Sequence, residues 1–495
     1  MKNQQEFSIN FRKMVITLVM LTMVVSACSS DLTSLPPPGV EESLLSATAT
    51  VQPTPLPTRE TFSPGQLVDY IAQTGDTLPA IAAHFNTTEE EIRAANTFIP
   101  TQVTTMPPGM PMQIPIYYES LWGSAYQIIP DSLFINGPAQ IDFDVESFVN
   151  DQPGWLKSYR EYSANEWRTG GQIVDYIATT FSISPRLLLA LLEYQGQALT
   201  NPEQPDTNYI LGYQDPYHSG MYLQLVWAAN ALNNGYYGWR SGELTEFEMT
   251  DGQLTRPDPW QNAATVGIQY YFAQLFNQQD FLGATLSTGL SAAYQRLFGD
   301  PWVSVEPHIP GSLYQPVLDL PFSAGAFWAF TGGPHTGWGT GAPYAALDFA
   351  PPSVVGGCTD TEEWATAVGD GVIVRRDAAI AVLDLDGDGD EHTGWVIFYL
   401  HLATDSIPAV GTVMHAGDPI GHPSCEGGRS TGTHVHIARK YNGEWILADS
   451  PLAFNLQGWI AHNGTEAYAG TLTRYSEVVV ACVCSDSESQ LEAQP

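Results

Sequence analysis

The chain has 495 residues, which is too many for a single hydrophobic core, so we expect several domains. Its 18 Lys and Arg residues stand against 53 Asp and Glu residues, which gives a formal net charge of −35. Contacts dominated by nucleic-acid phosphates need a basic surface, so this charge excludes nucleic acid as a partner. It also disfavours a polyanionic polymer, whereas an uncharged glycan or a peptide is compatible with it.

The N-terminal segment predicts export. Two basic residues precede an apolar run over residues 14–25, which is too short to span a bilayer but suits the core of a signal peptide. The run ends in Val25-Ser26-Ala27-Cys28, which resembles a bacterial lipobox. The resemblance implies removal of residues 1–27 as a lipoprotein signal peptide and lipidation of Cys28. The exported protein would then be held at the membrane of the bacterial cell envelope, unless this is a plain signal peptide with an incidental cysteine.

Residues 28–65 predict a tether. They are rich in Pro, Ser and Thr, as in Leu35-Pro36-Pro37-Pro38. Such a composition buries too little apolar surface to offset the entropy lost on ordering, so we expect an extended segment. It would hold the folded part of the chain away from the membrane.

Residues 66–117 predict a small α+β module of the order βααβ. The expected elements are a strand over 67–72, a helix capped by Asp76 or Thr77, a second helix capped by Thr87 or Thr88, and a closing strand over 112–115. The pattern resembles a LysM domain in Tyr70, Gly75-Asp76-Thr77-Leu78, Ile81-Ala82, Phe85, Asn96 and Ile114-Pro115. LysM domains bind N-acetylglucosamine chains between the first strand–helix turn and the second helix–strand loop, so the resemblance implies glycan binding at Gly75, Asp76 and Thr77. A βααβ spacer without binding is the alternative.

Residues 118–320 predict a mainly α domain, with helical periodicity over 171–178, 186–194, 221–230 and 263–276. The run from Pro185 to Leu192 resembles the lysozyme-like fold of lytic transglycosylases. The catalytic glutamate of that family falls on Gln195, which cannot protonate a glycosidic oxygen. The resemblance therefore implies a degenerate, glycan-binding domain. An active domain that uses Glu193 as a displaced acid and an unrelated helical spacer are the alternatives.

Residues 321–472 change to short β runs separated by Gly, Asp and Pro turns, which predicts a mostly antiparallel β domain, with 473–495 as a C-terminal tail. In Thr433-His434-Val435-His436, the two histidines share one face of a strand because side chains alternate along it. Two imidazoles in this position can meet at one metal site. A pair of surface histidines on an exposed strand is the alternative.

Further motifs accompany this histidine pair: Tyr399-Leu400-His401-Leu402, Gly417-Asp418-Pro419-Ile420-Gly421, and Ser430-Thr431-Gly432-Thr433 directly before it. Their order is similar to that of the lysostaphin and LytM zinc peptidases, over roughly residues 331–452. The resemblance implies that His436 is a metal ligand. It also implies that His434 and His401 are catalytic residues that line the site without binding the metal.

The other two ligands of that family come as His-x-x-x-Asp, and here the sequence departs from the pattern. Asp348 fits the aspartate, but Tyr344 occupies the position four residues before it. We interpret residues 336–347 as a loop inserted between the ligands, so that His335, Asp348 and His436 hold zinc. If His335 does not reach the metal, two ligands are too few for tight binding, and the domain is a binding pseudoenzyme.

The implied ligand set leaves a fourth zinc position for water, which becomes a nucleophile near neutral pH. His434 and His401 would orient or deprotonate this water, bind the oxyanion and help to protonate the leaving amine. We therefore expect a peptidoglycan-binding zinc endopeptidase that hydrolyses cell-wall peptide cross-links. The alternatives are a non-catalytic scaffold that binds peptidoglycan and activates another wall hydrolase, and a glycan-cleaving enzyme that acts through the helical domain.

An acidic run precedes the His401 strand. Asp384, Asp386, Asp388 and Asp390 alternate with Leu and Gly residues and begin like an EF-hand loop, which predicts a Ca²⁺ site. The twelfth position of that loop is Trp395 instead of Glu, so an acidic, solvated hairpin tip is the alternative.

Four cysteines follow the lipobox: Cys358, Cys425, Cys482 and Cys484. An even number in an exported chain predicts disulfides, but the spacing leaves their pairing open. A zinc site made of these four is the alternative, although they do not form paired CxxC motifs.

Overall fold

The computed structural model describes residues 61–120, 122–303, 305–353, 356–484 and 486–494. The chain from Thr61 onward forms one compact unit. The predicted signal peptide, Cys28 and nearly all of the predicted tether lie outside the described residues. Within the described ranges, no helix has both the length and the apolar character needed to cross a membrane.

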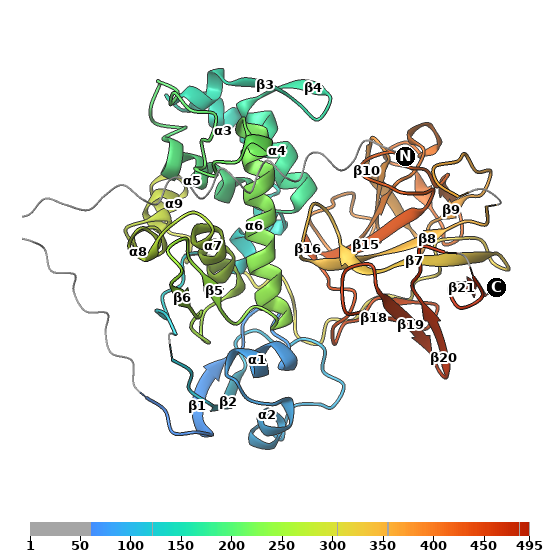
Figure 1. Cartoon of the computed structure of the whole chain (residues 1–495), viewed down its shortest axis with the longest axis horizontal. Coiled ribbons are helices and arrows are strands. Elements are labelled where there is room, and N and C mark those ends of the chain that lie inside the picture. Colours follow the sequence, from blue (N-terminus) through green and yellow to red (C-terminus); the bar gives the residue numbers. More distant parts are fainter. Residues whose placement is uncertain (1–60, 121, 304, 354–355, 485, 495) are drawn as a thin grey trace, which may run out of the picture. The chain divides into compact units, whose positions relative to one another are not determined.

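The first module has the predicted βααβ order (Figure 1). Its elements are β1 (Gln66–Ile71), α1 (Leu78–His84), α2 (Glu89–Ala95) and β2 (Pro111–Ile116), and the two strands pair antiparallel. Thr77 caps α1 and Thr88 caps α2, because each hydroxyl accepts a backbone N–H of the first turn. Ile81, Phe85 and Ile114 are fully buried between the strands and helices. The local capping signals therefore place both helices as the sequence predicts.

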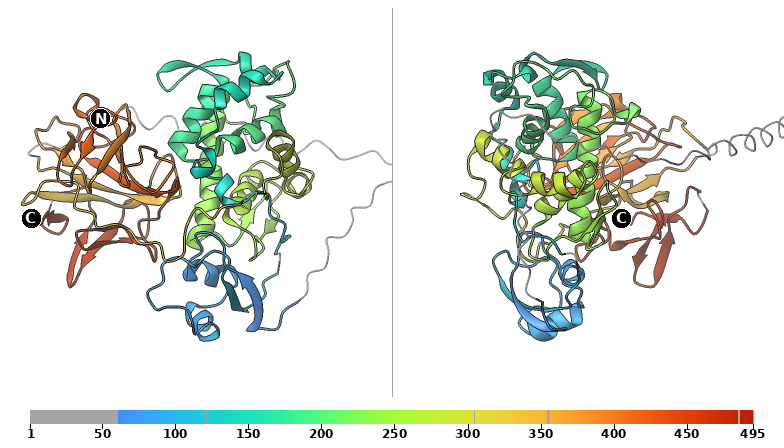
Figure 2. Two further views of the ribbon diagram at one scale, coloured as in Figure 1. Left: turned by 180° about the vertical axis from the view of Figure 1, so that it is seen from behind. Right: turned by 60° about the vertical axis from the view of Figure 1, so that its left-hand side comes forward.

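The middle region is mainly helical, also as predicted. Its helices are α3 (Val145–Asp151), α4 (Gly170–Phe181), α5 (Pro185–Gly196), α6 (Met221–Ser241), α7 (Ala263–Ala273), α8 (Gln278–Thr285) and α9 (Leu290–Phe298). Two short hairpins accompany them, β3 (Arg160–Ser163) with β4 (Glu166–Thr169), and β5 (Phe247–Glu248) with β6 (Leu254–Thr255). Helix α6 runs through the middle of this region (Figures 1 and 2). Its length of 21 residues lets it contact several other parts of the chain.

In the described part of the C-terminal region, the main sheet has nine antiparallel strands in the order β13-β10-β11-β12-β15-β8-β7-β21, with β16 beside β15. Their bounds are β7 (Phe327–Thr336), β8 (Tyr344–Ala350), β10 (Gly371–Asp377), β11 (Ile380–Asp384), β12 (Trp395–Leu400), β13 (Val413–Met414), β15 (Val435–Tyr441), β16 (Glu444–Trp445) and β21 (Gln490–Glu492). Strands β9 (Ala365–Thr366) and β14 (Pro419–Gly421) form a separate pair. The predicted antiparallel β region is therefore present.

The described residues of the predicted C-terminal tail (473–495), namely 473–484 and 486–494, instead belong to the fold. A second sheet contains β17 (Asn455–Leu456), β18 (Trp459–Asn463), β19 (Gly470–Arg474) and β20 (Glu477–Val480). The three consecutive valines of β20 favour a strand, and β21 pairs with β7 at the edge of the main sheet. The tail prediction was wrong because an edge strand of three residues carries almost no periodic signal.

The two faces of the main sheet belong to different cores. Phe398 and Ala438 pack into the hydrophobic core of the helical region, whereas Ile397 and Ile437 pack into the core on the other face. Because side chains alternate along a strand, His436 lies on the same face as Ala438. The histidine-bearing face is therefore the face that packs against the helices.

Candidate metal centre

Three neighbouring strands carry the residues that the sequence analysis assigned to a metal. Strand β7 carries His335, β8 carries Asp348 and β15 carries His436. His436 lies opposite Asp348 in the β15–β8 register, and His335 lies opposite Ala346 in the β7–β8 register. Residues 337–343, part of the segment interpreted as an insertion, are the connection of the β7–β8 hairpin. Strand pairing therefore brings together three residues that lie apart in the sequence.

The atoms that could bind a metal lie close together. Nε2 of His335 and Nδ1 of His436 are each 3.2 Å from Oδ1 of Asp348, and they are 3.0 Å from one another. All three side chains are buried. Within the described residues, Oδ1 of Asp348 accepts no well-aligned hydrogen bond. A buried carboxylate oxygen beside two imidazoles needs a compensating charge, which a divalent cation would supply.

Backbone carbonyls fix the orientation of both imidazoles. Nδ1 of His335 lies 2.8 Å from the carbonyl oxygen of Gly333, and Nε2 of His436 lies 3.1 Å from that of Gly337. A carbonyl only accepts, so these nitrogens carry the protons and the other nitrogen of each neutral ring carries a lone pair. The two lone pairs face each other and Asp348, as expected around a cation whose histidine ligands are oriented by their second N–H.

His401 and His434 lie next to this cluster. Their ring centroids are 4.5 Å apart, and Nε2 of His434 is 3.7 Å from Oδ2 of Asp348. Nδ1 of His401 donates to the carbonyl of Glu426 at 2.6 Å, and Nδ1 of His434 donates to that of Gly432 at 2.8 Å. Nε2 is then the nitrogen of each ring that can take up a proton. Burial lowers the pKa of His401 to about 4, so this ring is neutral near pH 7.

Comparison with known proteins assigns the chain to a family. The family model described as LysM domain matches residues 70–115, and the model described as LasA, N-terminal domain, matches residues 127–311. The beta-lytic metalloendopeptidase of Lysobacter enzymogenes is 31% identical over 137 residues, which cover 26% of this chain and 71% of that protein. The chain belongs to the beta-lytic metalloendopeptidase family.

Other relatives of this metalloendopeptidase cover different shares of the chain. Protease LasA of Pseudomonas aeruginosa is 24% identical over 335 residues, which cover 64% of this chain and 74% of LasA. Among solved structures, the M23 metalloprotease pseudoalterin from the deep sea is 25% identical, with 34% of this chain and 96% of that chain covered at a TM-score of 0.29. The predicted LysM and metallopeptidase identities are confirmed, whereas the likeness of the helical region to lysozyme stays a prediction.

Tyr468 is a residue near the metal centre that the sequence analysis missed. It lies between β18 and β19, and its ring stacks on the ring of His335 with centroids 4.1 Å apart and an interplanar angle of 22°. Its backbone also exchanges hydrogen bonds with Gly333 and Pro334. Burial raises the pKa of its phenol, so the hydroxyl keeps its proton near neutral pH. No motif marks it, because its position follows only from the packing of the second sheet on β7.

Helix α6 holds the hairpin connection of the metallopeptidase region. Oδ1 of Asn230 accepts the backbone N–H of Thr340 at 2.7 Å, and Oδ1 of Asn234 accepts that of Ala342 at 2.7 Å. Gly339 and Gly341 both have positive φ, and a Cβ at either would overlap one of these asparagines. The same connection contains Gly337, whose carbonyl orients His436. The helical region is thus in direct contact with the support of the metal centre.

A disulfide lies close to His401. Cys358 pairs with Cys425, which immediately precedes the residue that binds Nδ1 of His401. The other pair is Cys482 with Cys484, so the structure resolves the pairing that the sequence left open. All four sulfurs are used in disulfides, which removes the alternative of a zinc site made of these cysteines.

The acidic run forms a turn that its own carboxylates stabilise. Oxygens of Asp384, Asp386 and Asp388 come within 4.8 Å of one another. Asp384 accepts backbone N–H groups of Asp386, Gly387 and Gly389, and Asp390 instead contacts the ring of His392 at 2.5 Å. These hydrogen bonds give the carboxylates a structural role, because they cap the backbone N–H groups of the turn. Calcium at this position stays a prediction.

The acidic side chain proposed as a displaced acid in the helical region is used for local structure. Glu193 is buried and accepts the backbone N–H groups of Leu199 and Thr200 together with the Thr200 hydroxyl. Gln195 bonds to the carbonyl of Leu211 and accepts the hydroxyl of Tyr271. Neither side chain is oriented as a glycosidic acid, which weighs against the glycan-cleaving alternative.

The turn predicted to bind glycan is half-buried against other parts of the chain. Asp76 is buried and accepts the hydroxyl of Tyr70 and the backbone N–H of Gln73, both at 2.7 Å. Burial raises the pKa of Asp76 to about 6. Thr77 caps α1, and a Cβ at Gly75 would lie 2.7 Å from the guanidinium carbon of Arg240. Of the three predicted glycan residues, Asp76 and Thr77 thus have structural roles.

Proposed function

We propose that this metalloendopeptidase is a zinc enzyme that binds peptidoglycan and hydrolyses its peptide cross-links. The observation that carries the proposal is the cluster of His335, Asp348 and His436, in which each histidine donates its outer N–H to a carbonyl and turns a lone pair inward. Two imidazoles and one carboxylate are a typical ligand set for catalytic zinc. Oxygen-rich sets favour calcium or magnesium instead, so the donor chemistry supports zinc.

Zinc in such a site acts as a Lewis acid that polarises a peptide carbonyl and activates water near neutral pH. His401 is neutral and has its Nδ1 proton committed to a carbonyl, so Nε2 is suited to accept a proton from the attacking water. His434 has the same arrangement and lies beside Asp348. We assign to the pair the transfer of that proton to the leaving amine. The protonated ring also stabilises the negative charge on the reacting carbonyl oxygen.

Peptidoglycan is proposed as substrate because a LysM module and a metalloendopeptidase region occur in one chain. The excess of acidic residues is compatible with a partner made of uncharged sugars and short peptides. Export and lipid anchoring through Cys28 are part of the same proposal and would keep the enzyme at the cell envelope. Loss of membrane association on Cys28→Ser replacement, measured by fractionation, tests that part separately.

The decisive experiment measures zinc content and muropeptide release with the full chain and its His335→Ala and His436→Ala variants. His415→Ala is a matched control, because this histidine is largely exposed and remote from the site. We expect about one zinc per chain and new peptide amino groups for the parent and the control, and loss of both in the two site variants. Zinc retained by His335→Ala would refute the ligand assignment. No zinc and no cleavage in the parent would favour the peptidoglycan-binding scaffold.

A further inference from the structure

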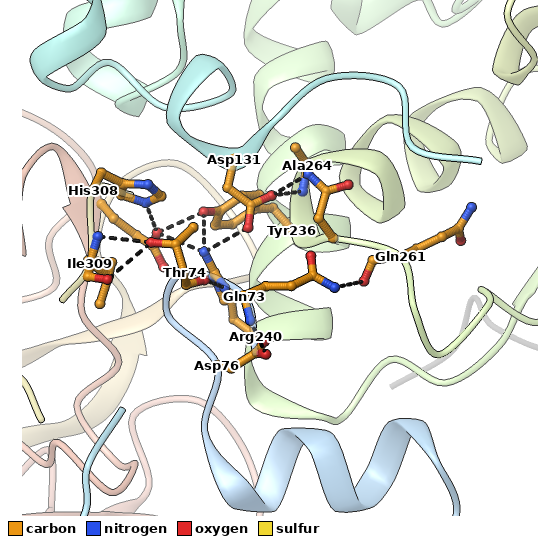
Figure 3. A network of polar contacts seen from close by, with 12 residues as sticks. Gln73, Thr74, Asp76, Asp131, Tyr236, Arg240, Gln261, Ala264, His308 and Ile309 are labelled. Carbon is orange, nitrogen blue, oxygen red and sulfur yellow. Dashed lines mark hydrogen bonds and ion pairs between the residues drawn. The ribbon is translucent and has the colours of Figure 1, made fainter. Parts of the chain in front are cut away.

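A segment of this chain occupies the LysM loops that were predicted to bind glycan. Residues 309–313, which precede the main sheet, lie against the turn at Thr74 and against the loop at Thr105. The hydroxyl of Thr74 accepts the backbone N–H of Ile309 at 2.9 Å and donates to the carbonyl of Ile309 at 3.2 Å (Figure 3). One hydroxyl thus satisfies both peptide groups of a single residue.

The second LysM loop binds the other end of the segment. The hydroxyl of Thr105 donates to the carbonyl of Pro310 at 2.7 Å and accepts the N–H of Leu313 at 3.0 Å. Its backbone carbonyl accepts the N–H of Ser312 at 2.8 Å, and Thr104 donates to the carbonyl of Leu313 at 2.6 Å. The segment is therefore bound through its peptide groups, along a bend and a turn of the chain.

The packing around the segment is close on one side and open on another. Gly311 approaches the second loop so closely that a Cβ would lie 2.5 Å from Cα of Pro107. Ile309 and Leu313 are buried. An adjoining cavity of about 390 Å³ is lined in part by Gly75, Thr77, Thr105, Ile309, Leu313 and Arg240. A ligand entering this cavity would reach the hydroxyl of Thr105, which also binds the segment.

A buried charged network lies directly beside the segment (Figure 3). His308, the residue before the segment, is 2.5 Å from a carboxylate oxygen of Glu444, and Arg240 of α6 also bonds to Glu444. Arg240 in addition donates to the carbonyl of Thr74 in the LysM turn. Displacing the segment would therefore disturb contacts that link the LysM module, the helical region and the β15–β16 hairpin.

We infer that residues 309–313 act as an internal ligand of the LysM module and compete with N-acetylated glycan for the same loops. An acetamido group offers one amide N–H donor and one carbonyl acceptor, the same two kinds of group that Ile309 offers to Thr74 from its two flanking peptide units. Binding of a glycan strand then requires release of the segment and undocks the module from the rest of the unit. The inference rests on the proposed function in one respect, namely that glycan is the partner of the module.

The test uses the full chain and the tetramer of N-acetylglucosamine as probe. Gly311→Ala introduces a Cβ against Pro107 and displaces the segment without altering a LysM side chain. Gly283→Ala is the matched control, because a Cβ at that position meets open space. Calorimetry gives the affinity, and amide hydrogen exchange at Ile309, Ser312 and Leu313 reports on docking of the segment.

We expect weak tetramer binding by the parent and the control, with faster exchange at residues 309–313 when the tetramer is saturating. Gly311→Ala should bind the tetramer at least about tenfold more tightly and show fast exchange without it. Equal affinities, binding that leaves exchange slow, or no binding by any of the three proteins would overturn the inference. Zinc content and peptide release measured on the same preparations separate this result from the proposed function. If cleavage persists while the competition fails, only the internal-ligand inference is lost.

Discussion

Helix α6 contacts the rest of the chain in two ways that differ in chemistry. Near its C-terminal end, Arg240 lies in a buried charged network with Glu444 and Asp131. One to three turns earlier, Asn230 and Asn234 hold the β7–β8 connection through neutral amide oxygens. The first contact links three regions of the molecule, and the second holds the hairpin that carries His335 and Asp348.

Because of this difference, we expect one contact mainly to stabilise the chain and the other mainly to position the β7–β8 connection. Attraction to Arg240 and His308 outweighs the effect of burial and lowers the pKa of Glu444 to about 2, so its charge persists at neutral pH. Buried charges are costly to separate, so this contact should dominate stability. The asparagines carry no charge and bind backbone N–H groups, so they should contribute less stability and more geometry.

Arg240→Met is expected to have the largest effect on stability. It removes the cation shared by Glu444 and Asp131 and leaves both carboxylates buried, so the free energy of unfolding should fall by about 3–5 kcal/mol. Denaturant unfolding of the full chain measures the loss. The double variant with Glu444→Gln should recover part of it, and zinc content should not change in either protein. A loss below about 1 kcal/mol would mean that the buried network stabilises the chain no more than an exposed ion pair does.

The stability of the region around Arg240 should also depend on pH. Two buried groups there, His84 and Asp76, change the stability in opposite directions as the pH falls. Burial, together with the nearby charge of Arg240, lowers the pKa of His84 from 6.5 to about 3. The ring of His84 stacks on that of Trp239, with the ring centroids 3.4 Å apart. The unfolded chain binds the proton first, so stability from His84 is lost as the pH falls below 6.5. Burial raises the pKa of Asp76 from 3.8 to about 6, so the folded chain binds that proton first. Asp76 therefore adds stability as the pH falls through 6, and the two groups offset each other.

His84→Gln separates these opposing effects. Between pH 6 and 4.5 the variant lacks the loss due to His84 but keeps the gain due to Asp76, at about 1.4 kcal/mol per pH unit. As the pH falls from 6 to 4.5, the free energy of unfolding of the variant should therefore rise by about 2 kcal/mol relative to that of the parent. Glu444 titrates only below this window, since its pKa moves from 4.5 to about 2. Urea unfolding at several pH values measures the difference, and a difference independent of pH would contradict the prediction.

The sequence predicts local structure well and contacts between regions poorly. The cap at Thr77 and the alternation of His434 and His436 depend on near neighbours, so both can be found from a pattern. His335 was proposed because the expected motif lacked a histidine, and the β7–β8 hairpin explains how this side chain comes to lie beside Asp348. By contrast, Asn234 meets Ala342 across 108 residues through a single amide, and such a pair has no periodic signature.

Asn234→Ala tests the contact that the uncharged asparagines make with the β7–β8 connection. We expect it to cause the smallest change in the free energy of unfolding. It removes the acceptor of the Ala342 N–H and loosens the connection that contains Gly337, the residue that orients His436. Loss of such an outer contact commonly lowers metal affinity by about 10–100-fold, and we expect the lower end of that range. Competition with a chelator measures the zinc dissociation constant, and amide exchange at Ala342 reports on the hairpin.

Two aspartate variants distinguish positioning from a general loss of packing. Asn234→Asp keeps an oxygen acceptor for the Ala342 N–H, so zinc affinity should stay within about threefold of the parent. Asn230→Asp should not be tolerated in the same way, because Nδ2 of Asn230 donates to the carbonyl of Val226 at 2.9 Å and a carboxylate oxygen there would be repelled. If Asn234→Asp lowers zinc affinity as much as Asn234→Ala does, the oxygen of Asn234 does not position the hairpin. The contact would then matter only as packing between α6 and the sheet, and the two contacts of the helix would differ in strength alone.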